Sequence, residues 1–334
     1  MNNELNTSDF VYGSELQGRG YVTQTDIIFG TFTTATGIVA LCGAMLNFYF
    51  IKNLKAFHNP FGFFWAVRTV GELGSDIVYA IYTGPITLVQ STSIPPGINI
   101  FAYHLAMTFG YIQCLMHWGV SVNRLVAVWF PFYYDRIFNK KLCVIVVIGI
   151  CLDAFMIVSL YLLFPCNHIG YSPQLHENVF VKCSPEQENS LLTPIIMKAC
   201  YSIACAGTAL INLTTFGKIA YIRITSKVKY NNVQFRRDIR LFIIGVMQDI
   251  NMVVVIGSIV VYNNEANTST FAILLSYDGL VFIYILNTFF MTFFNPECRR
   301  FLFKTGSKVH TLSYIEPTEG PTTQWTPESQ AVTK

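Results

Sequence analysis

Three charged side chains interrupt an otherwise apolar stretch of the sequence. Arg68, Glu72 and Asp76 follow one another at intervals of four residues, so on a helix they share one face. An ionisable side chain at membrane depth is costly and is therefore a candidate functional residue. Arg68 can pair with Glu72 or extend to the membrane interface. For the group, two interpretations are open: a hydrogen-bonded cluster that fixes helix packing, or a switch element that responds to sodium ions or protons.

Asparagines in two other apolar stretches can complete this polar cluster. We expect Asn47 and Asn287 to lie at the depth of Asp76 and to be its hydrogen-bond partners. Asp278 is a further charge at membrane depth. Together with Glu72, these residues form the predicted intramembrane polar network.

A second set of residues could line a ligand pocket. His104, Met107, Tyr111 and Cys114 follow one another at helical spacing on one face of a third stretch. Such a stripe either packs in a helical core or borders a pocket. Lys198, in a fifth stretch, could neutralise an acidic ligand or extend to the interface. The predicted pocket residues are His104, Met107, Tyr111 and Lys198.

Motifs for enzyme chemistry are not found in this sequence. No His, Cys, Asp and Glu residues have the spacing of metal ligands, and there is no glycine-rich phosphate loop or nucleophile elbow. We therefore expect no catalytic residue, no cofactor, no bound metal and no nucleic-acid partner.

The composition is that of a membrane protein. Of 334 residues, 52% are hydrophobic and only 12% are charged, whereas a soluble domain has roughly 25% charged residues. A helix needs about 20 mostly apolar residues to cross the hydrocarbon core. The sequence predicts an all-α membrane protein with seven spans, at Ile27–Ile51, Phe61–Thr83, Ile98–Phe130, Leu142–Phe164, Leu191–Ile222, Leu241–Tyr262 and Phe271–Phe294.

The basic residues between the spans indicate the orientation. Fifteen lysines and arginines follow spans one, three, five and seven, and only Arg19 and Lys182 lie on the other side. Because positive charge is enriched in cytoplasmic loops, we expect an outside N-terminus and a cytoplasmic C-terminus. The basic residues also favour anionic lipid headgroups.

This orientation divides the chain into three parts. Residues 1–26 form a polar extracellular tail with a glycosylation sequon at Asn6. Residues 27–304 form the membrane domain, and residues 305–334 form a cytoplasmic tail expected to be disordered.

Two cysteines fall in the outer loop that follows the fourth span. Cys166 and Cys183 lie outside the membrane, where disulfides persist. A bond between them would pin a long, flexible lid; the alternative is that they are free or paired differently.

A charged residue lies near the end of the third span. Asn123, Arg124 and Leu125 lie at its cytoplasmic end. A guanidinium has five rigid donors and stays charged, so Arg124 can bridge to a neighbouring helix in one state and to a partner protein in another.

Several stretches, including the one around Arg124, resemble a known receptor family. They are NPFGFFWAVRTVGELGSDIVYAIYTGP (59–85), VNRLVAVWFPFYYDRIF (122–138), RLFIIGVMQDI (240–250), SYDGLVFIYILN (276–287) and FFNPECRRF (293–301). The chain resembles the rhodopsin-like G-protein-coupled receptors and, more closely, the nematode serpentine chemoreceptors of class X (Srx-type).

The resemblance implies a receptor of the plasma membrane, in a sensory-neuron cilium, that binds a small molecule and signals through a heterotrimeric G protein. It implies that Arg124 is the switch residue and that Glu297–Lys304 form a short amphipathic helix. Asn123 stands where the superfamily usually has an acid. An acid that restrains Arg124 must then come from elsewhere, and Asp238 and Asp135 are the candidates. The alternative function is a ligand-gated ion channel or a transporter.

Overall fold

The computed structural model describes four long segments of the chain and a few residues of a fifth. These are residues 11–163, 166–183, 192–225 and 270–303, with 243, 246–248, 250, 251 and 254. The predicted sixth span, Leu241–Tyr262, contains the residues of this fifth segment. They are the seven residues of the span that are described, and all seven are helical. Asn6 and the tail 305–334 lie outside the described residues.

The described segments are mostly long helices. Five predicted spans coincide with helices to within a few residues, and the second continues farther than predicted. The elements are α1 (Gln24–Asn53), α2 (Pro60–Val78), α3 (Gly84–Val89), α4 (Pro96–Trp129), α5 (Tyr134–Ile137), α6 (Lys140–Leu163), β1 (Ile169–Ser172), β2 (Glu177–Phe180), α7 (Leu192–Thr225), α9 (Thr270–Phe294) and α10 (Pro296–Phe303).

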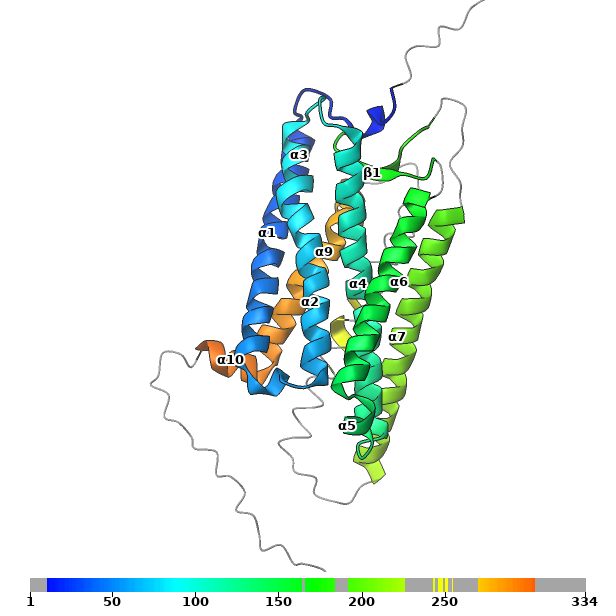
Figure 1. The fold of residues 1–334 in the computed structure, drawn as a ribbon. Coiled ribbons are helices and arrows are strands. Elements are labelled where there is room, and N and C mark those ends of the chain that lie inside the picture. The colour runs from blue at the N-terminus through cyan, green and yellow to red at the C-terminus, as the bar shows by residue number, and fades with distance from the viewer. Residues whose placement is uncertain are drawn as a thin grey trace, which may run out of the picture.

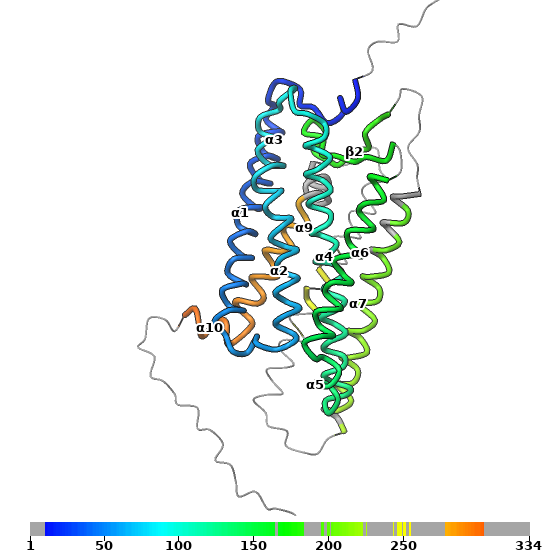
Figure 2. Tube along the Cα trace, viewed as in Figure 1, coloured from blue at the N-terminus to red at the C-terminus, as the bar shows by residue number. Residues whose placement is uncertain are grey.

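The helices lie side by side in one bundle. Helices α2 and α4 pack together in its middle, with α1 and α9 on one side and α6 and α7 on the other (Figure 1). The β strands, the N-terminal segment and α3 lie at one end, which we call the hairpin end (Figure 2). Helices α5 and α10 lie at the opposite end, which we call the α10 end.

Local capping residues explain where two helices begin. Thr23 and Asp26 form a capping box at the start of α1, in which each side chain accepts a hydrogen bond from the backbone of the other residue. Helix α1 therefore begins three residues before the predicted boundary at Ile27. Asn59 caps α2 by accepting from the backbone N–H of Gly62 at 2.9 Å, and Pro60 occupies the first helical position.

Helix α2 continues into α3 through one turn of π-helix. The turn covers Tyr79–Thr83, and Pro85 is the second residue of α3, which follows it. Proline lacks the backbone N–H that would bond to the carbonyl four residues earlier, and a wider turn accommodates this loss. The second predicted span is thus a continuous helical segment, from Pro60 to Val89, that reaches the hairpin end.

The loop that joins α6 to α7 contains a β-hairpin. Strands β1 and β2 pair antiparallel, with Ile169 opposite Phe180 and Ser172 opposite Glu177. All four residues of β1 are buried. The pattern of this loop does not predict the hairpin, because its alternation of polar and apolar residues is too short to indicate strands.

Three described helices are long and apolar enough to cross a membrane by length and composition: α1, α6 and the Ser202–Ile222 part of α7. Helices α9 and α10, bent by 80° at Asn295, make a fourth if they are taken together. Helix α6 leaves Leu152, Phe155 and Met156 about 60% exposed. An apolar face of this kind suits contact with lipid tails.

Glycines let α2 and α4 approach closely. A Cβ atom added at Gly71 would lie 2.8 Å from the carbonyl oxygen of Phe109 and 2.9 Å from the backbone nitrogen of Gln113. Because both are backbone atoms of α4, the neighbour cannot move aside without shifting a helix. The close contact brings the charged face of α2 against the bundle interior.

We expect Gly71→Ala to destabilise the fold by about 1–3 kcal/mol because it overpacks the α2–α4 contact. Thermal unfolding of the purified protein in detergent would measure this change. Gly149→Ala on α6 is the matched control, since nothing lies within 4 Å of its added Cβ atom, and alanine is the better helix former. Equal melting temperatures for the two variants would contradict the prediction.

Candidate functional site

A buried ion pair lies on the interior face of α2. The guanidinium of Arg68 donates from Nε and Nη2 to Oε1 of Glu72, at 3.2 and 3.0 Å. The two residues are only 3% and 1% exposed. Of the two predicted arrangements for Arg68, pairing is the one observed, and extension to the interface is not.

The ion pair also connects α2 to α9 and to a described part of the sixth predicted span. Arg68 Nη1 donates to Oε1 of Gln248 at 2.9 Å, and Gln248 Nε2 donates to the carbonyl oxygen of Asn287 at 3.3 Å. Asn287 Nδ2 donates back to Glu72 Oε1 at 3.2 Å. These four residues form a closed ring of hydrogen bonds, which we call the interior ring.

The predicted partners of Asp76 are wrong in this structure. Asn287 bonds to Glu72, and Asn47 Nδ2 donates to Thr288 Oγ1 at 3.0 Å. Within the described residues, neither oxygen of the fully buried Asp76 carboxylate has a hydrogen-bond partner. Helical spacing places Glu72 and Asp76 on one face of α2. It does not predict which of the two lies at the same depth as Asn287 of α9.

Asp278, the remaining member of the predicted network, lies apart from the interior ring. Its Oδ2 accepts a hydrogen bond from Thr33 Oγ1 at 2.9 Å, and the residue is 1% exposed. This bond joins α1 to α9. The predicted network is therefore observed as separate contacts rather than as one cluster.

The predicted switch residue lies near the α10 end of α4. The guanidinium carbon of the half-buried Arg124 lies 5.2 Å from the ring centroid of Phe61 on α2. Its neighbour Asn123 is buried and donates to the hydroxyl of Tyr134 on α5 at 3.1 Å. Asp135 is exposed on α5, and Asp238 lies outside the described residues. The acid that restrains Arg124 stays a prediction.

Aromatic side chains at the end of α4 and in the turn after it are exposed. Phe132, in the turn between α4 and α5, is 96% exposed, and Phe130 and Tyr133 are at least half exposed. Trp129, at the end of α4, has the ammonium of Lys218 from α7 at 4.8 Å from its ring. The α10 end therefore presents an exposed apolar turn as well as the switch candidate Arg124.

The predicted pocket residues of α4 pack toward α6. His104 donates from Nδ1 to the carbonyl oxygen of Ile100 at 2.7 Å, and its ring lies edge-on to Tyr161 of α6. Tyr111 is 1% exposed, and Met107 packs at the margin of the same core. Lys198 belongs to α7, but its side chain is not among those described. Their role as a pocket stays a prediction.

The hairpin is closed by a disulfide. Cys166 and Cys183 are bonded, with their Cα atoms 5.4 Å apart. The bond joins the chain just before β1 to the chain just after β2. The loop is therefore an ordered, covalently closed hairpin.

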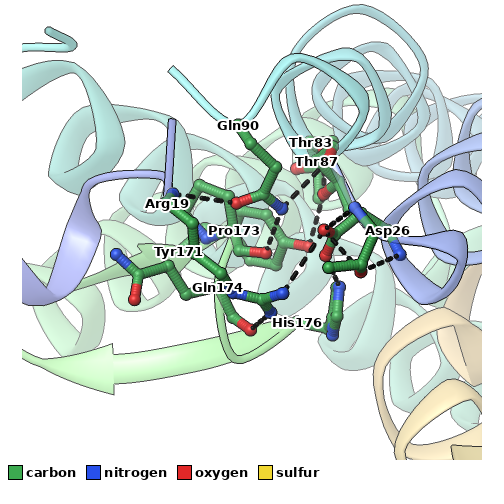
Figure 3. Close-up of polar contacts among 10 residues, drawn as sticks. Arg19, Asp26, Thr83, Thr87, Gln90, Tyr171, Pro173, Gln174 and His176 are labelled. Carbon is green, nitrogen blue, oxygen red and sulfur yellow. Dashed lines mark hydrogen bonds and ion pairs between the residues drawn. The ribbon is translucent and has the colours of Figure 1, made fainter. Parts of the chain in front are cut away.

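A polar cluster at the hairpin end was missed by the sequence interpretation. Asp26 is fully buried and contacts Arg19 of the N-terminal segment and His176 of the hairpin turn (Figure 3). Burial lowers the pKa of His176, and the neighbouring Asp26 carboxylate partly opposes this effect. The T-x-x-D spacing of the capping box is readable from the sequence, but its meeting with His176, 150 residues away, is not.

Metal binding has no visible basis in the described part of the chain. No three His, Cys, Asp or Glu side chains come together there in a way that could hold a metal ion.

Comparison with known proteins gives a consistent result. Residues 37–295 match the family described as serpentine type 7TM GPCR chemoreceptor Srx. The chain is 23% identical over 206 residues to olfactory receptor 10D1B of Mus musculus, covering 59% of this chain and 58% of that protein. It is 26% identical over 129 residues to serpentine receptor class X 45 of Caenorhabditis elegans, covering 37% and 34%. The chain spans less than two thirds of the length of each of these relatives.

We expect Glu72→Gln to destabilise the protein by about 3–5 kcal/mol, because it leaves the Arg68 guanidinium buried without a counter-charge. Thermal unfolding in detergent would measure the loss. The double variant Arg68→Met/Glu72→Gln removes both charges and should recover most of it. An equal loss in the single and double variants would show that the two charges are not coupled.

Proposed function

Because this chain belongs to the Srx family of serpentine seven-transmembrane chemoreceptors, we propose that it binds an external small molecule and signals through a heterotrimeric G protein. The protein is a multi-pass helical membrane protein, and we place it in the plasma membrane, in the cilium of a sensory neuron. The family match favours this function over an ion channel or a transporter.

The proposal assigns opposite roles to the two ends of the bundle. The hairpin end faces outward, because α1, α4, α7 and α9 end at the α10 end and most of the lysines and arginines follow them in the sequence. An outward position also suits the disulfide of the hairpin. The G protein would then meet the α10 end.

One observation carries the coupling role most directly. Arg124 lies against Phe61 at 5.2 Å near the end of α4, and the exposed turn that follows α4 holds Phe132. An apolar side chain that is 96% exposed at the same end of the bundle as a permanent positive charge is a suitable anchor for a partner protein. Arg124 would leave Phe61, and either Asp238 or Asp135, when the partner binds.

The interior ring supports a route from one end to the other. It joins α2, α9 and the sixth predicted span, and Phe61 is the second residue of α2. A ligand that favours one packing of these helices would shift the population of the state that accepts the partner. The predicted pocket, with His104, Met107, Tyr111 and Lys198, would lie closer to the hairpin end.

The orientation can be tested with an N-terminal epitope tag. We expect an antibody to stain intact cells, and we expect a glycosidase to increase the gel mobility of the wild type but not of Asn6→Gln. A tag accessible only after permeabilisation would contradict the proposed orientation.

The coupling role can be tested by replacing Arg124 with alanine. We expect Arg124→Ala to reduce G-protein signalling at least tenfold at equal surface expression, since an interaction of about 1.4 kcal/mol corresponds to a factor of ten. The assay would use cells with a set of chimeric Gα subunits, both without ligand and with a broad odorant panel. Arg136→Ala is the matched control, because Arg136 is an exposed basic residue of the neighbouring helix α5.

The same cells distinguish the two candidate functions. Ligand-gated current that persists when G-protein signalling is blocked would favour a channel. A surface-expressed wild type that activates no Gα subunit under any condition would refute the proposed receptor function.

A further inference from the structure

The polar cluster at the hairpin end joins three separate parts of the chain. Asp26 Oδ2 accepts from the backbone N–H and the hydroxyl of Thr23 at 2.8 and 2.7 Å, and Arg19 Nη1 lies 3.4 Å from it. The other carboxylate oxygen, Oδ1, is 2.8 Å from Nε2 of His176. We call Arg19, Asp26 and His176 the hairpin latch (Figure 3).

Further hydrogen bonds anchor the latch to α3 and to the hairpin turn. The backbone N–H of Arg19 donates to Oε1 of Gln90 at 3.2 Å, and Gln90 Nε2 donates to the carbonyl oxygen of Pro173 at 2.7 Å. Arg19 Nη2 also donates to the carbonyl oxygen of Gln174. The latch therefore holds the N-terminal segment, the start of α1, the end of α3 and the hairpin turn against one another.

The imidazole of His176 is enclosed on several sides. Its ring stacks on Phe29 of α1, with the centroids 4.5 Å apart and the planes 11° apart, and the side chain is 8% exposed. A carboxylate only accepts hydrogen bonds, so Nε2 of His176 carries the hydrogen that it donates to Asp26. A neutral imidazole is sufficient for this bond, because Arg19 already balances the charge of Asp26.

A second proton on this imidazole would add a cation to a site that already contains one. Burial of the ring is the largest effect on its pKa and lowers it, Arg19 adds to the lowering, and Asp26 opposes both. The charged groups that act on His176 are Arg19 of the N-terminal segment and Asp26 of α1. Glu177 of β2 follows it in the chain, and Tyr171 of β1 interacts with Asp26 and with Asp278 of α9. Gln90 and Thr87, from the α3 side, carry no charge.

We propose that His176 is a proton-binding site whose protonation releases the hairpin from α1, so that external acid is a second input to this protein. The released imidazole is hydrated and takes up a proton with an ordinary pKa of about 6.5. The latched imidazole takes up a proton only at lower pH. The latch is therefore fully formed above about pH 6.5 and is lost as the pH falls from there toward the latched pKa.

The number of protons taken up when the latch opens determines how steeply the opening equilibrium depends on pH. One proton taken up on release changes the opening equilibrium by up to tenfold per pH unit within this window. Carboxyl groups titrate near pH 4 in water, below the window, so Asp26 does not account for a change that begins near pH 6.5.

The inference depends on the proposed function for the outward position of the latch and for its effect on signalling. Release of the latch itself can be measured without a G protein. Hydrogen exchange of the full chain in lipid nanodiscs is suitable, because the segments that the latch holds together contain hydrogen-bonded amides. Gly18 and Gly20 donate to the carbonyl oxygens of Ser91 and Gln90, and His176 donates its backbone N–H to Ser172.

We expect wild-type protection at these amides to fall by up to tenfold per pH unit below about pH 6.5, after correction for the intrinsic exchange rate. His176→Gln keeps a side-chain N–H donor for Asp26 but does not titrate, so its protection should not change over this range. His168→Gln is the matched control. It removes the other histidine of the hairpin loop, which bonds to the hydroxyl of Tyr12, and it should retain the wild-type pH profile.

Two results would overturn the inference. One is amide protection in the wild type that does not change with pH. This measurement needs no variant, so it tests the inference even if a variant fails to fold. The other is a pH profile in His176→Gln that equals the wild type. Arg19→Gln gives a further test: without the neighbouring cation, the protonated imidazole is better tolerated and the pH dependence should weaken.

The test separates this inference from the proposed function. A pH-dependent latch in a protein that activates no G protein would refute the receptor function and leave the proton site intact. A receptor that signals to odorants, but whose amide protection at the latch does not change with pH, would refute the proton site alone.

Discussion

The bundle depends on the requirement that buried charges be satisfied by other groups of the protein. Arg68 and Glu72 are almost fully buried, and each would be very costly alone. Their mutual bonds, together with Gln248 and Asn287, determine how α2 is rotated and how α9 sits beside it. The glycine contact at Gly71 then allows α4 to pack against the next face of α2.

The two ends of the bundle are built differently. At the hairpin end, a disulfide, a capping box and the hairpin latch hold the N-terminal segment, α1, α3 and the loop together. At the α10 end, Arg124 and the turn around Phe132 are accessible. In the proposed receptor, a closed outer end and an accessible inner end suit a signal that passes through helix packing.

Periodicity predicted the shared face of the polar residues but not their partners. The spacing of Arg68, Glu72 and Asp76 placed all three on one face of α2, and the structure buries that face. The level of Asn287 relative to α2 depends on helix tilt, on the loops and on the π-turn at Tyr79–Thr83. None of these can be read from the sequence of a single helix. Asn287 lies one helical turn away from its predicted level, so it bonds to Glu72 instead of Asp76.

The sequence alone determined what is set by composition and by near neighbours. Apolar stretches of membrane length, the positions of the helices, the shared face of Arg68 and Glu72 and the motifs of the Srx family all depend on residues close together in the chain. Tertiary structure decided the contacts between distant residues. The bond of His176 to Asp26 spans 150 residues, and the hairpin that presents His176 is too short to show a periodic pattern. Such contacts exist only after the helices have packed, so the latch could be found only in the folded protein.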